Sequence, residues 1–340
     1  MRRAYLAAVV PRREAQTTIR RATEAGIFDP GRKPIQRYGS VEVPVKRPMA
    51  GQKTVRQEHP EFYHKTLGLV DLFRDRDRIS PEQVALLPRS WYILGTVITV
   101  KIDPRVEDLK RDIGSALLSI YPRCRCVLMD RGIEGQFRVP KREVIAGTGA
   151  ETETVHRENG VVFKLDAMKI MFSAGNLRER MRMSRIGDDE FVVDMFAGIG
   201  YFSLPMAVHS RPDRVLSIEL NPLAHGYLTE NVRLNKVEGI VDPVLGDCAE
   251  EVPEGEADRV VMGFVEFTDR YLKEGIRALR SGGTLHYHQT VFEHLYPGAL
   301  VEDVRRKAED LGRRVRVLRC ARVKKYSPGV VHAVLDAVIT

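Results

Sequence analysis

Residues 191–202 read FVVDMFAGIGYF, and this stretch decides how the second half of the 340-residue chain folds. The three residues before Asp194 are apolar, which predicts a buried strand. Gly198 and Gly200 follow, and glycine in a tight turn lets the backbone approach a ligand without a Cβ in the way. A helix is expected from Phe202. The stretch therefore predicts a strand, a glycine turn and a helix, with the turn at the carboxyl end of the first strand of a parallel sheet.

From about residue 168 onward, strands and helices alternate. Strands are expected at 191–195, 214–219, 242–245, 259–262, 283–288, 313–319 and 330–338. Helices are expected at 202–209, 222–235, 268–279 and 300–311. Strands separated by helices of this length predict right-handed crossovers and a doubly wound α/β sheet, and the short loop before the last strand predicts an antiparallel pair.

Acidic residues end the next two strands of this pattern. Glu219 lies 25 residues after Asp194, at a position where a carboxylate can accept hydrogen bonds from two ribose hydroxyls. Asp247 and Cys248 follow a further strand and are expected at an adenine edge. A dinucleotide site has a third glycine at the helix start, where this chain has Ser203. S-adenosylmethionine therefore fits better than NAD, and a dehydrogenase is the least favoured function.

Positive charge is concentrated at the start of the chain. The formal net charge is +8, and residues 1–50 hold 11 Lys and Arg against 4 Asp and Glu. A basic segment on a near-neutral body indicates either a surface for a polyanion such as RNA or DNA, or only a solvated basic face. The residues expected to contact phosphate are Arg2, Arg3, Arg12, Arg13, Arg20, Arg21, Arg32, Lys33 and Arg37.

Composition shifts divide the chain into four segments. Residues 1–50 are expected to form a small basic domain, 51–66 a polar linker, 67–167 a second α/β domain, and 168–340 the domain that binds S-adenosylmethionine. The four cysteines form no C-x-x-C pair, and no apolar run approaches the roughly 20 residues that cross a bilayer. We therefore expect a cytoplasmic protein with reduced thiols and no metal.

Two adjacent motifs carry a family resemblance. Residues 171–180, MFSAGNLRER, precede DMFAG at 194–198, and together they resemble an archaeal tRNA-modifying family. That family contains the guanine-N1 methyltransferase acting beside the anticodon and the wybutosine-synthesising aminocarboxypropyltransferase. The resemblance covers nearly the whole chain. It implies a Rossmann-like class I methyltransferase fold with an antiparallel terminal strand, plus smaller N-terminal α/β modules. It also implies a monomer that binds the anticodon stem-loop of tRNA, with the basic domain on the tRNA body.

One loop separates the two branches of that family. Methyltransferases that act on nitrogen commonly carry N-P-P-Y or N-L-P here, whereas this chain has Gly263, Phe264 and Val265. A flexible glycine at this position leaves room for the methionine arm to lie differently and to present its γ-carbon. Residues 285–289, LHYHQ, also resemble the aminocarboxypropyltransferase branch. Their two histidines, at 286 and 288, are expected to be packed on one strand face.

The predicted reaction follows from that branch. S-adenosylmethionine would donate its 3-amino-3-carboxypropyl group to carbon 7 of the tricyclic precursor 4-demethylwyosine in tRNA(Phe). Two alternatives stay open. One is guanine-N1 methylation at the same nucleotide. The other is a non-catalytic tRNA-binding protein that keeps the donor pocket.

The resemblance also implies residue roles. Arg180 would hold the methionine carboxylate with its planar fork. Glu179 matches the general base of the methyltransferase relative, and it would either accept the proton from carbon 7 or only orient the base. Asn176 would hydrogen-bond the substrate or serve the local turn. The expected donor-binding set is Ser173, Arg180, Asp194, Phe196, Gly198, Gly200, Glu219, Asp247 and Cys248, and the expected substrate loop is Gly263, Phe264 and Val265.

Overall fold

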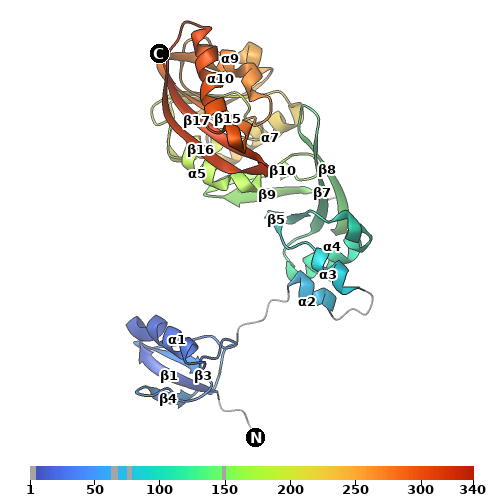
Figure 1. Ribbon diagram of the computed structural model, residues 1–340, viewed down its shortest axis with the longest axis vertical. Helices are drawn as coiled ribbons and strands as arrows, with labels where there is room; N and C mark the ends of the chain where they lie inside the picture. Colours follow the sequence, from blue (N-terminus) through green and yellow to red (C-terminus); the bar gives the residue numbers. More distant parts are fainter. Residues whose placement is uncertain (1–4, 63–67, 75–78, 148–150) are drawn as a thin grey trace. The chain divides into compact units, whose positions relative to one another are not determined.

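The computed structural model describes residues 5–62, 68–74, 79–147 and 151–340. These residues belong to two compact units, Met1–Gly68 and Leu69–Thr340, and each is described by itself (Figure 1). No helix among the described residues is long and apolar enough to cross a membrane.

The first unit is a four-stranded antiparallel sheet covered by one helix. Its order is β2-β3-β1-β4. The elements are β1 (Leu6–Pro11), α1 (Ala15–Glu24), β2 (Ile35–Arg37), β3 (Ser40–Val45) and β4 (Lys53–Arg56). Strand β4 lies in the segment expected to be a linker. It pairs with β1, so the folded part of this unit extends beyond residue 50.

One of the expected phosphate contacts in this unit is wrong. Arg32 is only 1% exposed, and its guanidinium donates to the carbonyls of Leu6 and Val45 at 2.8 and 3.0 Å. Asp29 Oδ2 forms an ion pair with Arg32 Nε at 2.8 Å. A buried cation needs such partners, so Arg32 joins strands instead of binding a ligand. Arg2 and Arg3 lie outside the described residues.

The second unit begins with a four-stranded sheet of order β5-β6-β7-β8. Its elements are α2 (Leu69–Arg74), α3 (Pro81–Leu86), β5 (Trp91–Leu94), β6 (Val97–Val100), α4 (Lys110–Ile120), β7 (Cys126–Glu134) and β8 (Val139–Gly147). The helix predicted at 80–87 is confirmed, with Ser80 and Gln83 forming a capping box. The single strand predicted over 91–102 is wrong, because the chain reverses at Gly95, whose φ is +53°, and forms a hairpin.

Strands β9 (Glu153–Glu158) and β10 (Val161–Asp166) form a two-stranded hairpin. The hairpin packs against helix α7 (Pro222–Asn235), which belongs to the seven-stranded domain. The amide of Asn231 accepts from Lys164 N at 2.7 Å, and the amide of Asn235 accepts from Val162 N at 2.8 Å. Both amides also donate to the carbonyls of the same two β10 residues. The side chains of α7 thus satisfy the free edge of β10. This hairpin, expected in the second domain, also contacts that domain, where Thr154 Oγ1 accepts from Thr96 N at 2.9 Å.

The seven-stranded sheet has the order β13-β12-β11-β14-β15-β17-β16, and β17 is antiparallel to both of its neighbours. The predicted doubly wound class I fold is confirmed. Its strands are β11 (Phe191–Asp194), β12 (Arg214–Glu219), β13 (Val241–Leu245), β14 (Ala257–Met262), β15 (Leu279–Phe292), β16 (Val315–Ser327) and β17 (Val330–Ile339). Its helices, with α7, are α5 (Leu177–Met183), α6 (Ser203–His209), α8 (Cys248–Glu251), α9 (Leu272–Ala278) and α10 (Gly298–Glu309).

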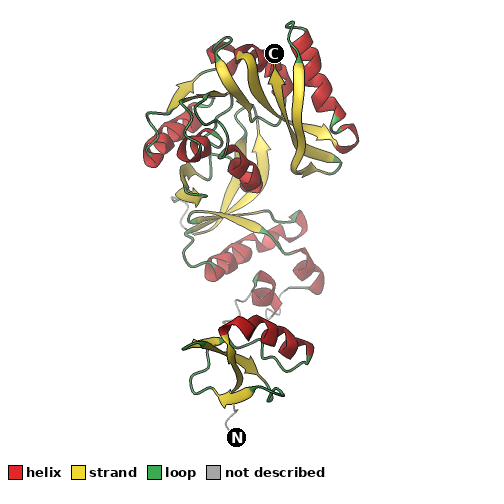
Figure 2. Ribbon diagram, turned by 90° about the vertical axis from the view of Figure 1, so that its left-hand side faces the viewer, coloured by secondary structure: helices red, strands yellow, loops and turns green. Residues whose placement is uncertain are grey.

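Helices cover both faces of this sheet (Figure 2). Val192 of β11 packs into the core that includes residues of α6 and α7, whereas the next residue, Val193, packs into the core that includes residues of α9 and α10. Successive strand residues point to opposite faces, which explains why these strands read as continuous apolar runs.

The glycine turn gives a stability prediction. Gly200 has φ +98°, and a Cβ there would lie 2.5 Å from Leu204 Cγ. We expect Gly200→Ala to lower the free energy of unfolding by about 1–3 kcal/mol, measured by urea denaturation. Gly226 on α7 is the matched control, because nothing lies within 4 Å of its Cβ position. Gly226→Ala should raise stability by about 0.5–1 kcal/mol. If the two substitutions changed the free energy of unfolding equally, the proposed strain at Gly200 would be wrong.

Candidate active site

A cavity of about 610 Å³ opens at the carboxyl edge of the parallel strands. Residues from the ends of β11, β12, β13 and β14 line it, together with the β7–β8 hairpin, the segment 169–176 before α5, and the last two strands. This is the edge where open α/β sheets bind ligands, and the volume lies within the usual range for small-molecule pockets.

The glycine turn and Glu219 form one side of the cavity. Gly198 has φ +59°, and its N–H donates to Glu219 Oε2 at 2.7 Å. The other carboxylate oxygen accepts from Asn221 N at 2.8 Å. Burial raises the pKa of Glu219. Gly198 and Glu219 both line the cavity, as the sequence predicted.

Asp194 stabilises this turn through hydrogen bonds and does not line the cavity. Its carboxylate is 1% exposed and accepts from Ser203 Oγ at 2.7 Å and from Phe196 N at 3.4 Å. Burial raises the pKa of Asp194 to about 6. Gly200 is likewise absent from the cavity wall, since its α-carbon faces Leu204. Both residues support the turn rather than contact a ligand.

Three aromatic rings form an aromatic wall of the cavity. The rings of Phe196 and Phe264 stack at 5.3 Å with an interplanar angle of 25°, and Tyr271 meets Phe196 edge-on at 5.4 Å. Asp247 caps α8 by accepting from Ala249 N at 2.9 Å. Next to it, burial raises the pKa of the Cys248 thiol to about 12 and keeps it protonated. All of these except Ala249 line the cavity.

Gly263 does not have the role expected for it, that of a flexible glycine in the substrate loop. A Cβ on Gly263 would lie 2.8 Å from the ring of Phe202, which stacks on His288 at 5.3 Å. The φ of Gly263 is outside the left-handed region. Glycine is therefore required at position 263 because the ring of Phe202 packs closely against it. The expected reason, a flexible backbone, is wrong. Val265 accepts a backbone hydrogen bond from Thr290 at 3.0 Å.

The expected role of Arg180 as the carboxylate-binding residue is contradicted by its partner. Its Nε and Nη2 donate to the two carboxylate oxygens of Glu158 at 2.6 and 2.7 Å, and its Nη1 donates to the Ser173 carbonyl at 2.8 Å. Although burial alone would raise the pKa of Glu158, hydrogen bonds from His156 and Arg180 hold it at about 2. The fork of Arg180 is already used, so this residue fixes the loop that carries Ser173.

Lys324 on β16 is a cavity residue that sequence reasoning missed. Its Nζ donates to Ser173 Oγ at 2.7 Å, and no ion pair to it is found among the described residues. Burial, and then the charges of Arg138 and Arg180, lower its pKa. The predicted strand ended at residue 319, short of Lys324. An ammonium without a counterion beside Ser173 is suited to bind an anionic group.

The two expected catalytic residues occupy different environments. Asn176 lines the cavity, and its buried Oδ1 has no hydrogen-bond partner in the part of the chain that is described. Glu179 is 5% exposed and does not line the cavity. Arg182 donates to both of its carboxylate oxygens, at 3.0 and 3.1 Å. Glu179 is therefore not placed to contact a substrate directly.

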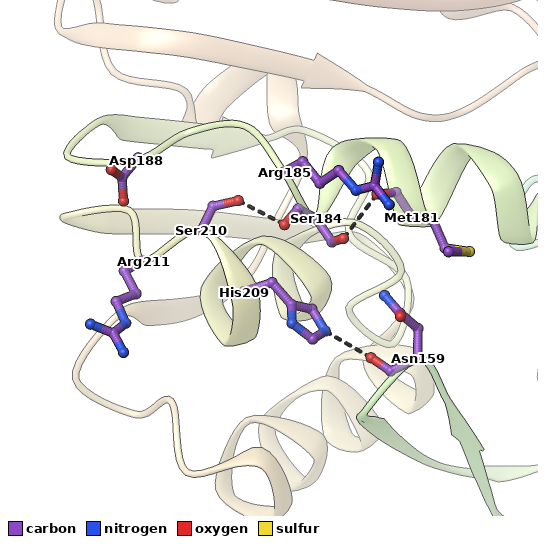
Figure 3. A pocket seen from close by; sticks show the side chains of 8 residues that line it. All are labelled: Asn159, Met181, Ser184, Arg185, Asp188, His209, Ser210 and Arg211. Atoms are coloured by element: carbon purple, nitrogen blue, oxygen red, sulfur yellow. Dashed lines mark hydrogen bonds between the residues drawn. The ribbon is translucent and has the colours of Figure 1, made fainter.

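A second hollow of about 440 Å³ lies away from this edge, between α5 and the end of α6 (Figure 3). Some of its polar groups are hydrogen-bonded to backbone carbonyls. Ser210 donates to the carbonyl of Ser184 at 2.8 Å, and His209 Nε2 lies 2.7 Å from the carbonyl of Asn159. The groups suited to chemistry are therefore those of the larger cavity.

The fold and the larger cavity define a class I S-adenosylmethionine-dependent transferase. Comparison with family models agrees, since residues 154–318 match the TRM5/TYW2 methyltransferase domain and residues 73–150 match the TYW2 N-terminal domain. The chain belongs to the TRM5/TYW2 family.

Individual relatives fall in two groups. The chain is 39% identical to the tRNA(Phe) (4-demethylwyosine(37)-C(7)) aminocarboxypropyltransferase of Pyrococcus horikoshii, over 80% of this chain and 98% of that one. The structure of P. horikoshii TYW2 in complex with MeSAdo superposes with a TM-score of 0.70 at 36% identity, covering 80% of this chain and 97% of that one. Trm5b of Pyrococcus abyssi, a tRNA (guanine(37)-N(1))-methyltransferase, is 33% identical over 97% of this chain and 98% of its own. Its crystal structure gives a TM-score of 0.77 at 99% coverage of both.

Proposed function

We propose that the protein transfers the 3-amino-3-carboxypropyl group of S-adenosylmethionine to carbon 7 of 4-demethylwyosine in tRNA(Phe). The observation that carries this choice is position 263. N-methyltransferases of the family place an Asn there, and in this chain Phe202 fills the space that an Asn side chain would need. Higher identity to the aminocarboxypropyltransferases than to Trm5b supports the same branch. Because the substrate is a tRNA, we place the reaction in the cytoplasm.

The cavity residues fit such a donor. Gly198 lines the cavity at the glycine turn, where a Cβ would lie 2.5 Å from Tyr201 Cε2, and Glu219 offers carboxylate oxygens to ribose hydroxyls. Asp247 and Cys248 then lie on the adenine side. Lys324 would bind the methionine carboxylate in place of Arg180, because its ammonium has no acidic partner among the described residues. The bound donor supplies a sulfonium whose adjacent carbons are open to nucleophilic attack.

Product analysis tests the proposed reaction. The enzyme would be incubated with tRNA that carries 4-demethylwyosine and with S-adenosylmethionine labelled in its carboxypropyl carbons. We expect the label in the tRNA and the larger aminocarboxypropyl mass increment on the modified nucleoside. A methyl increment on tRNA(Phe) that carries unmodified guanine at this nucleotide, incubated in parallel, would identify the sister reaction. Absence of any increment, with the donor still bound, would indicate a binding protein.

Lys324 gives a prediction about binding alone. We expect Lys324→Gln to weaken S-adenosylmethionine binding by about tenfold or more, because a charge-assisted hydrogen bond is lost. Affinity for methylthioadenosine, which lacks the carboxylate, should not change. Lys325→Gln, on the exposed neighbouring position, is the control. Equal weakening of both ligands, measured by calorimetry, would contradict the carboxylate contact.

The first unit is proposed to bind the body of the tRNA. Arg12, Arg13, Arg20 and Arg21 lie in or next to α1, are exposed, and would contact phosphates without reading sequence. A small folded domain of its own, with a basic helix face, fits such positioning. We also propose that the enzyme acts as a monomer.

Salt dependence tests this contact. Replacing Arg20 and Arg21 with Gln should lower tRNA affinity and reduce the slope of log affinity against log salt by about one per phosphate contact. The matched control replaces the adjacent exposed pair Arg305 and Arg306 on α10. An unchanged slope in the α1 variant, or an equal change in the control, would refute the proposed contact.

A further inference from the structure

A chain of buried side chains connects the cavity with Glu179. His332 on β17 lines the cavity and is 1% exposed, and His288 on β15 is fully buried behind it. The Nε2 of His332 lies 3.1 Å from Nδ1 of His288. The Nε2 of His288 lies 3.6 Å from Glu179 Oε1. This separation is longer than a hydrogen bond, and Nε2 of His288 makes none among the described residues, so Glu179 lies near the two imidazole rings without being hydrogen-bonded to them.

The negative charge of Glu179, 3.6 Å from His288 Nε2, favours one tautomer of both rings. Arg182 donates to both oxygens of Glu179, so these oxygens act as acceptors. An N–H at His288 Nε2 is therefore favoured, because a lone pair there would face a negatively charged oxygen. Nδ1 of His288 is then an acceptor and takes the proton on His332 Nε2. This arrangement leaves the Nδ1 of His332 without a proton.

That same atom lacks a partner. Nδ1 of His332 is buried and makes no hydrogen bond within the described residues. A buried acceptor without a partner costs free energy, and such atoms in a cavity wall are commonly satisfied by a ligand. The Nε2 of His288 is likewise buried without a hydrogen bond among the described residues, and Phe202 stacks on that ring at an interplanar angle of 25°. His332, a residue of the cavity wall, therefore carries one unprotonated ring nitrogen without a partner.

Charge at this position depends on Lys324. The two residues are cross-strand partners on β16 and β17. Burial, followed by the charges of His288 and Lys324, lowers the pKa of His332 to about 2, and burial followed by Arg182 lowers that of His288 to about 3. Both rings are therefore neutral. A carboxylate bound at Lys324 would offset the ammonium charge and make His332 a stronger base.

We propose that His332 is the catalytic base that removes the proton from carbon 7, with Glu179 acting through His288 as a positioning residue. This role rests on the proposed aminocarboxypropyl transfer. Carbon 7 forms a bond to the γ-carbon of the methionine arm as the γ-carbon–sulfur bond breaks, and that electron pair leaves with sulfur in methylthioadenosine. The carbon 7–hydrogen bond then breaks, and its electrons return to the ring. The proton goes to Nδ1 of His332, and the Nε2 proton can pass to His288 and toward Glu179.

Kinetics with a deuterated substrate test the base. We expect His332→Gln to lower kcat by about 100-fold or more, while affinity for S-adenosylmethionine changes by less than about threefold. Deuterium at carbon 7 should slow the variant more than the wild type, because proton removal becomes rate-limiting. His209→Gln is the control, since His209 lines the second hollow and lies outside the cavity wall. Its kcat should stay within about threefold of wild type.

The tautomer gives a readout that is independent of activity. Nitrogen NMR of the full-length protein labelled at histidine should show His332 protonated at Nε2 and bare at Nδ1, with the signals assigned through the His332→Gln variant. Glu179→Gln should weaken this preference. A proton on Nδ1 of His332, or a His332→Gln variant with kcat near wild type and no isotope effect, would overturn the role of His332. A methylated product from the wild type would instead overturn the proposed function itself.

Discussion

The buried carboxylate of Asp194 is the constraint on which the active-site edge depends. It accepts from Ser203 Oγ, which in turn accepts from Ser217 Oγ at 2.9 Å, and these bonds join β11, α6 and β12. Burial alone disfavours the charge, and a short polar chain compensates for it. Because the turn between Asp194 and Ser203 is fixed, Phe196 is held in the aromatic wall and Phe202 is held against Gly263.

The cationic side chains around the cavity have two different roles. Arg180 and Arg182 are committed to Glu158 and Glu179, so they organise the wall of the cavity. Lys324 lacks such a partner among the described residues and stands beside Ser173. Buried ion pairs of the first kind fix geometry, whereas an ammonium with only a hydroxyl partner can exchange that contact for a ligand carboxylate. The donor arm and the base would therefore meet at neighbouring positions of β16 and β17.

Much of the fold could be predicted, because local signals agree with tertiary structure where strands are buried on both faces. Strand β12 and helix α7 have the predicted bounds, and the glycine turn lies where the motif placed it. The second half of β16 could not be predicted, because its exposed residues and register shifts leave no alternation of apolar and polar residues. Lys324 lies in that half, so the sequence did not point to it as a cavity residue. Arg180 was assigned correctly to the cavity but wrongly to a ligand, since its partner Glu158 is 22 residues away and lies on another element. Pairing across such distances has no local pattern in sequence.

The proposed reaction requires that the methionine arm, and not the methyl group, faces the nucleobase. A crystal structure of the protein with S-adenosylmethionine and the tRNA anticodon stem-loop would show which group does. We expect the methionine carboxylate within hydrogen-bond distance of Lys324 Nζ, and the γ-carbon directed toward carbon 7 on the side of His332. A methyl group directed at the base, with the carboxylate away from Lys324, would contradict it.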